Sequence, residues 1–129
     1  MDPLILAVNG TLMRGLELNP NLQAVGATFV STATTAPLYR LWTIDDRFPA
    51  MLRSAPGREI ACELWAVPPD GLASVLMREP AGLTIGKVQL SDGREVLGVL
   101  AEPWLCENRP EITLFGGWRE YMAEQAKGA

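Results

Sequence analysis

Any proton transfer carried out by this chain has to use groups other than histidine, because none of its 129 residues is a histidine. This absence excludes Ser-His and Cys-His nucleophile systems, zinc sites of the HExxH type and histidine general bases. Cys62 and Cys106 stand far apart in apolar surroundings and are predicted to be reduced packing residues. Acid–base chemistry must therefore use a carboxylate, a tyrosine, a lysine, a cysteine or water.

Among the carboxylates, Glu79 occupies a position that does not favour helix stability. Apolar residues recur at helical spacing after Asp70, so the pattern predicts a helix that Asp70 caps and that Pro80 terminates at Glu79. A carboxylate in the last turn faces the negative end of the helix dipole, at a cost of about 0.3–1 kcal/mol. Two interpretations stay open: a general acid and base with a pKa raised by burial, or a solvated residue partly balanced by Arg78.

A second feature follows the first apolar run, residues 4–8. The main-chain N–H groups of Asn9, Gly10, Thr11 and Leu12 are predicted to form a concavity that binds a substrate carboxylate, with Gly10 permitting the dihedral angles of such a nest. The alternative is an ordinary turn that ends a strand. The segment lacks the glycine spacing and the lysine of dinucleotide-binding and P-loop motifs.

Arginine residues on predicted strands are candidates for holding the same carboxylate. Arg40 and Arg53 can each clamp a carboxylate in a bidentate manner, or simply point outward into solvent. Asp45 and Asp46 are adjacent acids in a loop and are interpreted as solvated turn residues rather than metal ligands. No metal or organic cofactor is predicted.

The elements that position these groups are mainly strands, predicted at 4–8, 27–36, 38–44, 50–53, 59–67, 83–90 and 95–101. The last two form a hairpin around Asp92-Gly93. Residues 9–19 are predicted to be a loop with at most one helical turn, and a final helix begins near Trp118. In strand 59–67 Glu63 falls on the alternating polar side. Many short strands with two main helices indicate one α+β domain spanning 1–129.

Several motifs in this order are typical of one known superfamily. Residues 8–15, Val-Asn-Gly-Thr-Leu-Met-Arg-Gly, resemble the loop after the first strand of γ-glutamylcyclotransferase-like proteins. Further motifs resemble the allophanate hydrolase C-terminal domain along nearly the whole chain: 35–41 (Thr-Ala-Pro-Leu-Tyr-Arg-Leu), 63–68 (Glu-Leu-Trp-Ala-Val-Pro), 88–94 (Val-Gln-Leu-Ser-Asp-Gly-Arg) and 115–121 (Phe-Gly-Gly-Trp-Arg-Glu-Tyr).

The resemblance implies a small mixed β-barrel of six or seven strands flanked by two main helices, with a ligand cavity at the loop after the first strand. It also implies an acidic general acid and base after the central helix, where Glu79 stands. The histidine usual in the first loop of allophanate hydrolase C-domains is missing, which excludes a histidine-dependent version of that chemistry.

Two functions are compatible with these features. The first is a cofactor-independent enzyme of amide metabolism that acts on a γ-glutamyl or ureido substrate, with Glu79 transferring protons and residues 9–12 anchoring a carboxylate. The second is a non-catalytic accessory or ligand-binding domain that partners an amidase such as allophanate hydrolase. A homodimer is possible by analogy with the family.

Composition narrows the remaining partners. The net charge of −4 and the absence of a basic cluster argue against nucleic acid. The longest apolar run is far shorter than the roughly 20 residues that cross a bilayer, and no basic segment precedes it. We therefore expect a cytoplasmic protein without a membrane partner.

Overall fold

The structure, a computed structural model, describes residues 1–128. Its strands are β1 (Leu4–Val8), β2 (Thr28–Thr34), β3 (Tyr39–Ile44), β4 (Phe48–Arg53), β5 (Ala61–Val67), β6 (Leu83–Gln89) and β7 (Glu95–Ala101). Its helices are α1 (Asn19–Ala24), α2 (Pro69–Met77), α3 (Pro103–Cys106) and α4 (Trp118–Lys127), with a 3₁₀ turn η1 (Thr113–Phe115). The α+β class and all the predicted strands are confirmed, with their ends displaced by a few residues.

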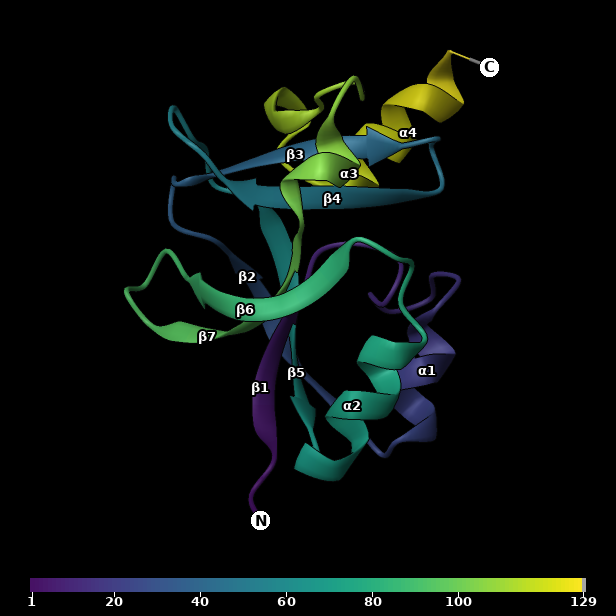
Figure 1. Cartoon of the computed structure of the whole chain (residues 1–129), viewed down its shortest axis with the longest axis vertical. Helices are drawn as coiled ribbons and strands as arrows, with labels where there is room; N and C mark the ends of the chain where they lie inside the picture. Colours follow the sequence, from purple (N-terminus) through teal and green to yellow (C-terminus); the bar gives the residue numbers. More distant parts are fainter. Residues whose placement is uncertain (129) are drawn as a thin grey trace.

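The first strand lies at the centre of the main sheet, whose order is β2-β5-β1-β7-β6. It pairs antiparallel with β5 and parallel with β7. Its continuous apolar sequence suits this position, because residues 6–8 are buried and need no polar side, whereas Leu4 is exposed and Ile5 is half-buried. In Figure 1 the helices α1 and α2 lie beside this sheet, and residue 1 lies next to the start of β1, at the end of the molecule away from β3 and β4.

The remaining two strands form a sheet of their own, β3-β4, which lies at the opposite end of the molecule beside α3 and α4 (Figure 1). Its turn carries Asp45 and Asp46, both with positive φ angles of 54° and 55°. Asp45 accepts a hydrogen bond from Arg109, and Asp46 accepts bonds from Thr43 and Tyr121. These acids therefore serve the hairpin and its attachment to α4, rather than being simply solvated.

The expected barrel is not closed within residues 1–128. The two edges of the main sheet, β2 and β6, meet only where these strands end: Ala36 N–H donates to Gln89, and Ser91 N–H donates to Thr34, both at 2.9 Å. One isolated bridge, Thr35 to Leu90, lies between them. Because β3 and β4 pair with each other instead of extending an edge, the sheet curls without completing a cylinder.

The helices differ from the prediction in two places. Asp70 does not cap α2: Pro68 is the N-cap residue and Asp70 lies in the first turn. The helix ends at Met77, with Arg78 as its C-cap, so Glu79 lies just beyond it. A six-residue helix, α1, begins at Asn19, where the predicted loop 9–19 ends, and it was not predicted; a proline in the first turn is compatible with helix initiation.

The core lies between the sheets and helices. Tyr39 is fully buried and its hydroxyl accepts the Gln89 N–H at 2.9 Å, which links the two sheets. Cys62 and Cys106 are buried and unpaired, as predicted, and burial raises their thiol pKa values to about 12 and about 11. Among the described residues no helix has the length and apolar character needed to cross a bilayer.

Candidate functional site

The candidate loop begins where the central strand ends, and its first side chain fixes it to a neighbouring strand. Asn9 is 4% exposed, and its Nδ2 donates to the main-chain oxygen of Val99 at 3.0 Å. Because Val99 belongs to β7, this bond holds the loop against the strand that lies parallel to β1. A buried amide satisfied in this way gives the following residues a fixed starting point.

Gly10 is required for a different reason from the one predicted. Its φ angle is not in the left-handed region. A Cβ atom at this position would instead stand 2.6 Å from Cδ of Pro49, which belongs to β4. The glycine therefore permits close packing of the loop on the second sheet, rather than an unusual dihedral angle.

The main-chain groups of the loop are used asymmetrically. The carbonyl oxygens of Gly10 and Thr11 accept from Met13 and Leu18 at 3.0 Å each, and that of Leu12 accepts from Nδ2 of Asn19 at 2.8 Å. In contrast, no hydrogen bond between residues 1–128 uses the N–H groups of Gly10, Thr11 or Leu12. Three consecutive donors are thus available to a bound oxygen atom or to water.

Glu79 and this loop line the same small cavity. We call it the inner cavity; it is bounded by residues 8–12 together with Phe48, Pro49, Glu79, Leu83 and Val99. Its volume is about 10 Å³, which is room for about one water molecule. Residues 70 positions apart in the sequence therefore meet around a space that a single reacting group or water can occupy.

The carboxyl group of Glu79 is only partly accessible to solvent. Burial raises its pKa from the ordinary 4.5 to about 7. The dipole of α2 acts less on Glu79 than the sequence indicated, because the helix ends before this residue. Desolvation alone accounts for the raised pKa of Glu79. A carboxyl group with a pKa near neutrality can both donate and accept a proton at physiological pH.

A wider space adjoins the inner cavity on the solvent side. This outer groove has a volume of about 330 Å³, shares Thr11, Phe48 and Glu79 with the inner cavity, and also contacts Arg47 and Arg78. The two arginines line this groove together with the candidate proton-transfer group. No sequence pattern indicated Arg47, which the β3-β4 turn brings here, and Arg78 was considered only as a charge balance for Glu79.

The two arginines singled out from the sequence lie elsewhere. Arg40 on β3 donates through Nε to Glu111 at 2.9 Å. Arg53 is exposed at the end of β4 and pairs in register with Tyr39. Neither lines the inner cavity or the outer groove. If a carboxylate is bound beside Glu79, Arg47 and Arg78 are better placed to hold it.

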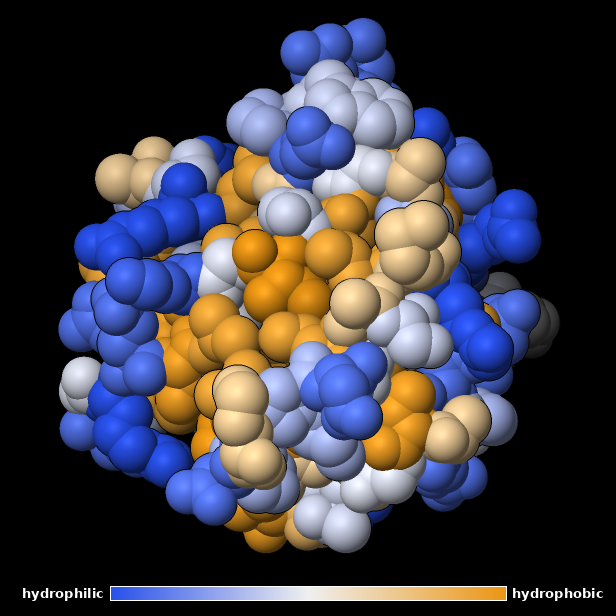
Figure 2. Space-filling model, turned by 60° about the horizontal axis from the view of Figure 1, so that its bottom comes forward, coloured by the Kyte–Doolittle hydropathy of each residue, from blue (hydrophilic) through white to orange (hydrophobic). Residues whose placement is uncertain are grey.

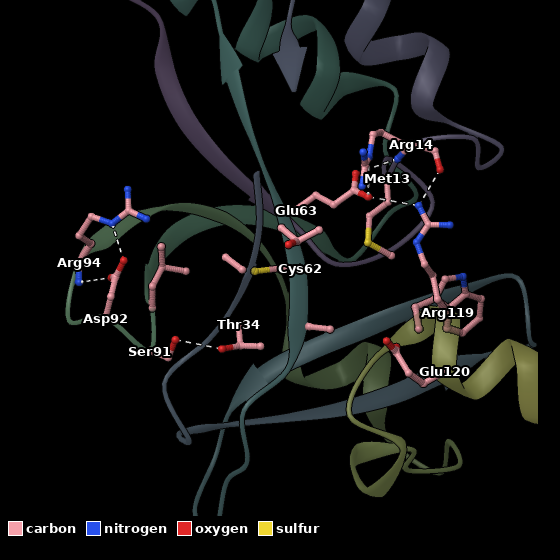
Figure 3. A pocket seen from close by; sticks show the side chains of 15 residues that line it. Met13, Arg14, Thr34, Cys62, Glu63, Ser91, Asp92, Arg94, Arg119 and Glu120 are labelled. Carbon is pink, nitrogen blue, oxygen red and sulfur yellow. Dashed lines mark hydrogen bonds and ion pairs between the residues drawn. The ribbon is translucent and has the colours of Figure 1, made fainter. Parts of the chain in front are cut away.

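One buried acid was missed entirely. Glu63 is only 2% exposed, although the alternation in its strand placed it on the polar side. Its carboxylate accepts from the main-chain N–H of Arg14 at 2.8 Å, and from the side chains of Arg14 and Arg119 at 3.2 Å each. Figure 3 shows these groups converging beside the end of the candidate loop. Glu63 thereby ties the loop to β5 and α4.

Comparison with known proteins identifies the relatives of this arrangement. Residues 4–123 match the family described as the allophanate hydrolase C-terminal domain. The urea amidolyase of Saccharomyces cerevisiae is 28% identical over 125 residues, which are 91% of this chain but only 7% of that protein. The chain thus spans a small fraction of the curated relatives that it matches.

Solved structures of similar proteins agree with this family match. The uropathogenic E. coli-specific protein c4763 superposes with a TM-score of 0.93 at 55% identity, covering 95% of this chain and 98% of that one. Kluyveromyces lactis allophanate hydrolase gives 0.89 at 28% identity, covering 97% of this chain and 22% of that one. An AIG2-like protein from Mus musculus, 16% identical with 88% of both chains covered, gives 0.64 and shows the shared fold alone.

Proposed function

Because the chain belongs to the family of allophanate hydrolase C-terminal domains, we propose that it binds a small carboxylate carrying an amide or ureido group and that Glu79 transfers protons during turnover. One observation carries the proposal: a partly buried carboxyl group with a pKa of about 7 borders the same cavity as three unpaired main-chain donors. Acid–base groups and oxyanion donors are the two components that amide chemistry requires.

The two adjoining spaces suggest a division of labour. The outer groove, at about 330 Å³, accommodates the body of a small substrate with its carboxylate toward Arg47 and Arg78. The inner cavity, at about 10 Å³, admits only the reacting carbonyl oxygen or a water molecule. In this arrangement the N–H groups of Gly10, Thr11 and Leu12 stabilise negative charge that develops on that oxygen.

The proton balance is simplest for a γ-glutamyl amide. Its amine attacks its own side-chain carbonyl carbon, so a C–N bond of a five-membered ring forms and the original amide C–N bond breaks. Glu79 takes a proton from the attacking amine and returns it to the departing nitrogen, so it ends in its starting state. The products are 5-oxoproline and the free amine. For a ureido substrate, water attacks the carbonyl carbon, a C–O bond forms and the C–N bond to the departing nitrogen breaks, while Glu79 takes a proton from the water and gives one to that nitrogen.

Turnover of γ-glutamyl amides and ureido carboxylates tests this directly. We expect Glu79→Gln to lower kcat/KM by at least about 100-fold, because the amide cannot exchange a proton near neutral pH. Glu107→Gln is the matched control, since Glu107 is an exposed carboxylate that lines neither the inner cavity nor the outer groove. Arg47→Gln should raise KM more than it lowers kcat. Equal rates for wild type and Glu79→Gln would remove the assignment.

A second function, that of an accessory domain, is favoured by a separate observation. The matched domain is a small part of a much larger urea amidolyase, and Figure 2 shows apolar side chains gathered between charged rims at the end where β1 begins. A shallow groove there is lined in part by Leu4, Ile5, Val96 and Leu97. Contact with an amidase domain would cover such a surface.

Titration of a separate allophanate hydrolase amidase domain with this domain distinguishes the two functions. An accessory role predicts measurable binding that a charge at Leu97 (Leu97→Glu) abolishes and that Glu79→Gln leaves unchanged. If no binding occurs while Glu79-dependent turnover does, the accessory role is excluded.

A further inference from the structure

We propose that a second small-molecule site lies between β2, β5, the β6-β7 turn and the start of α4, where Arg14 and Arg119 bind a small organic carboxylate. We call this cavity the arginine pocket. Its volume is about 670 Å³, within the range of ligand-binding sites and twice that of the outer groove. It shares no lining residue with either cavity at Glu79, so the proposal goes beyond the function described above.

The centre of the argument is the way Glu63 is satisfied. One carboxylate oxygen accepts from Arg14 N–H at 2.8 Å and from Trp65 Nε1 at 3.1 Å, and the other accepts from Arg14 Nε and Arg119 Nη2 at 3.2 Å each. Burial alone would raise the pKa of Glu63, but these hydrogen bonds outweigh it and lower the pKa. The carboxylate is therefore ionised, and its hydrogen-bonding capacity is filled.

Two guanidinium groups are more than this carboxylate needs. One arginine would neutralise the charge of Glu63, whereas two give the cluster of Glu63, Arg14 and Arg119 one net positive charge. The second cation also stands in the first turn of α4, where the helix dipole disfavours positive charge. Arg119 is thus placed at a position that neither the helix nor charge balance at Glu63 requires.

Both arginines keep donors free for a ligand. Their side chains are 51% and 44% exposed. Among residues 1–128, both Nη groups of Arg14 and the Nε and Nη1 groups of Arg119 make no hydrogen bond to protein. Arg14 is also held over the ring of Phe29, 3.7 Å from its centroid. The donors are therefore ordered in advance, which lowers the entropic cost of binding.

The rest of the pocket selects the chemical class of the ligand. Apolar side chains from β2, β5 and α4 line it, including Ala33, Cys62 and Trp118. At the other end Thr34 donates to Ser91 at 2.9 Å, beside Asp92 (Figure 3). Arg94 also lines this end and pairs with Asp92 at 2.9 Å, so Glu120 is the lining carboxylate that disfavours multiply charged anions such as polyphosphates. A carboxylate with a short apolar body satisfies the guanidinium groups and the apolar lining together.

Binding of benzoate and butyrate, followed by amide NMR shifts and calorimetry, tests the proposal, with benzamide and butyramide as neutral counterparts of the same shape. We expect the carboxylates to bind at least about tenfold more tightly than the amides and to shift the signals of Ala33, Cys62 and Trp118. Arg119→Gln should weaken carboxylate binding by at least about tenfold. Arg53→Gln, a loss of an exposed arginine outside the pocket, should leave it unchanged.

Two further variants separate this site from the others. Glu79→Gln should retain full carboxylate binding in the arginine pocket, so loss of binding there would show that the Glu79 groove had been observed instead. Arg119→Lys keeps the positive charge and one donor to Glu63, so we expect it to bind the carboxylate more tightly than Arg119→Gln does. This variant carries the test if urea unfolding shows that Arg119→Gln is unstable. Equal binding of amides and carboxylates, or unchanged affinity in Arg119→Gln, would overturn the proposal.

Discussion

Replacing Glu79 by glutamine should make the protein more stable at neutral pH, even though it removes the proposed catalytic group. Burial raises the pKa of Glu79 from 4.5 to about 7, and each pH unit of that difference corresponds to about 1.4 kcal/mol. Ionising Glu79 in the folded protein therefore costs about 3 kcal/mol, which partial exposure reduces to about 1–2 kcal/mol. Glutamine has nearly the same shape and no charge to bury.

Proton linkage determines whether the stability of the wild-type protein rises or falls with pH. Because the folded pKa is raised, the folded state binds more protons than the unfolded state between pH 4.5 and about 7, so wild-type stability falls as pH rises through this window. Below pH 4.5 both states are protonated and the penalty disappears. The advantage of Glu79→Gln should therefore be small at pH 4, grow up to about pH 7 and stay constant above it.

Urea unfolding followed by tryptophan fluorescence measures this difference at each pH. For a domain with an m-value of about 2 kcal/mol/M, 1–2 kcal/mol corresponds to a midpoint shift of about 0.5–1 M at pH 8. Glu17→Gln, at an exposed carboxylate of the outer groove, should show no such pH-dependent gain. A midpoint difference that is the same at pH 4 and pH 8 would refute the reasoning, as would a Glu79→Gln variant that is less stable at pH 8.

Three other substitutions address the parts that hold the site. Glu63→Gln leaves two arginines without their carboxylate and should cost about 3–5 kcal/mol of unfolding free energy in urea; a cost below 1 kcal/mol would contradict the role given to this acid. Gly10→Ala places a Cβ atom 2.6 Å from Pro49 and should cost about 1–3 kcal/mol, with partial recovery in the double variant with Pro49→Ala. Tyr39→Phe deprives the Gln89 N–H of its acceptor and should cost about 1–2 kcal/mol, with faster hydrogen exchange at Gln89; unchanged exchange there would argue against the bond.

Local patterns were sufficient for many of the elements. The uninterrupted apolar sequence of residues 4–8 predicted a strand covered on both faces, and it is the central strand. Asp92-Gly93 predicted the β6-β7 hairpin, in which Gly93 has a φ angle of 90° and Asp92 accepts the N–H of Arg94. These features depend on neighbouring residues, so the sequence contains the information directly.

Long-range contacts explain what could not be predicted. Glu63 was placed on a polar face because its partners, Arg14 and Arg119, lie 49 and 56 positions away. The segment from Asn19 looked like a turn, but Nδ2 of Asn19 bonds to Leu12 and helps α1 support the loop. The cavity shared by Glu79 and residues 9–12 was expected only from family resemblance, and the place of Arg47 in the adjoining outer groove depends on how the β3-β4 turn folds.

The central position of β1 has a consequence for synthesis on the ribosome. β1 can pair with β5 once residue 67 has emerged, but its other edge stays bare until β7, residues 95–101, is available. Asn9 likewise has to wait for the Val99 oxygen. A nascent chain that has not yet reached residue 101 therefore exposes one unpaired edge of an apolar strand beside an unformed loop, and binding competence should arise late in the synthesis of this domain rather than in stages.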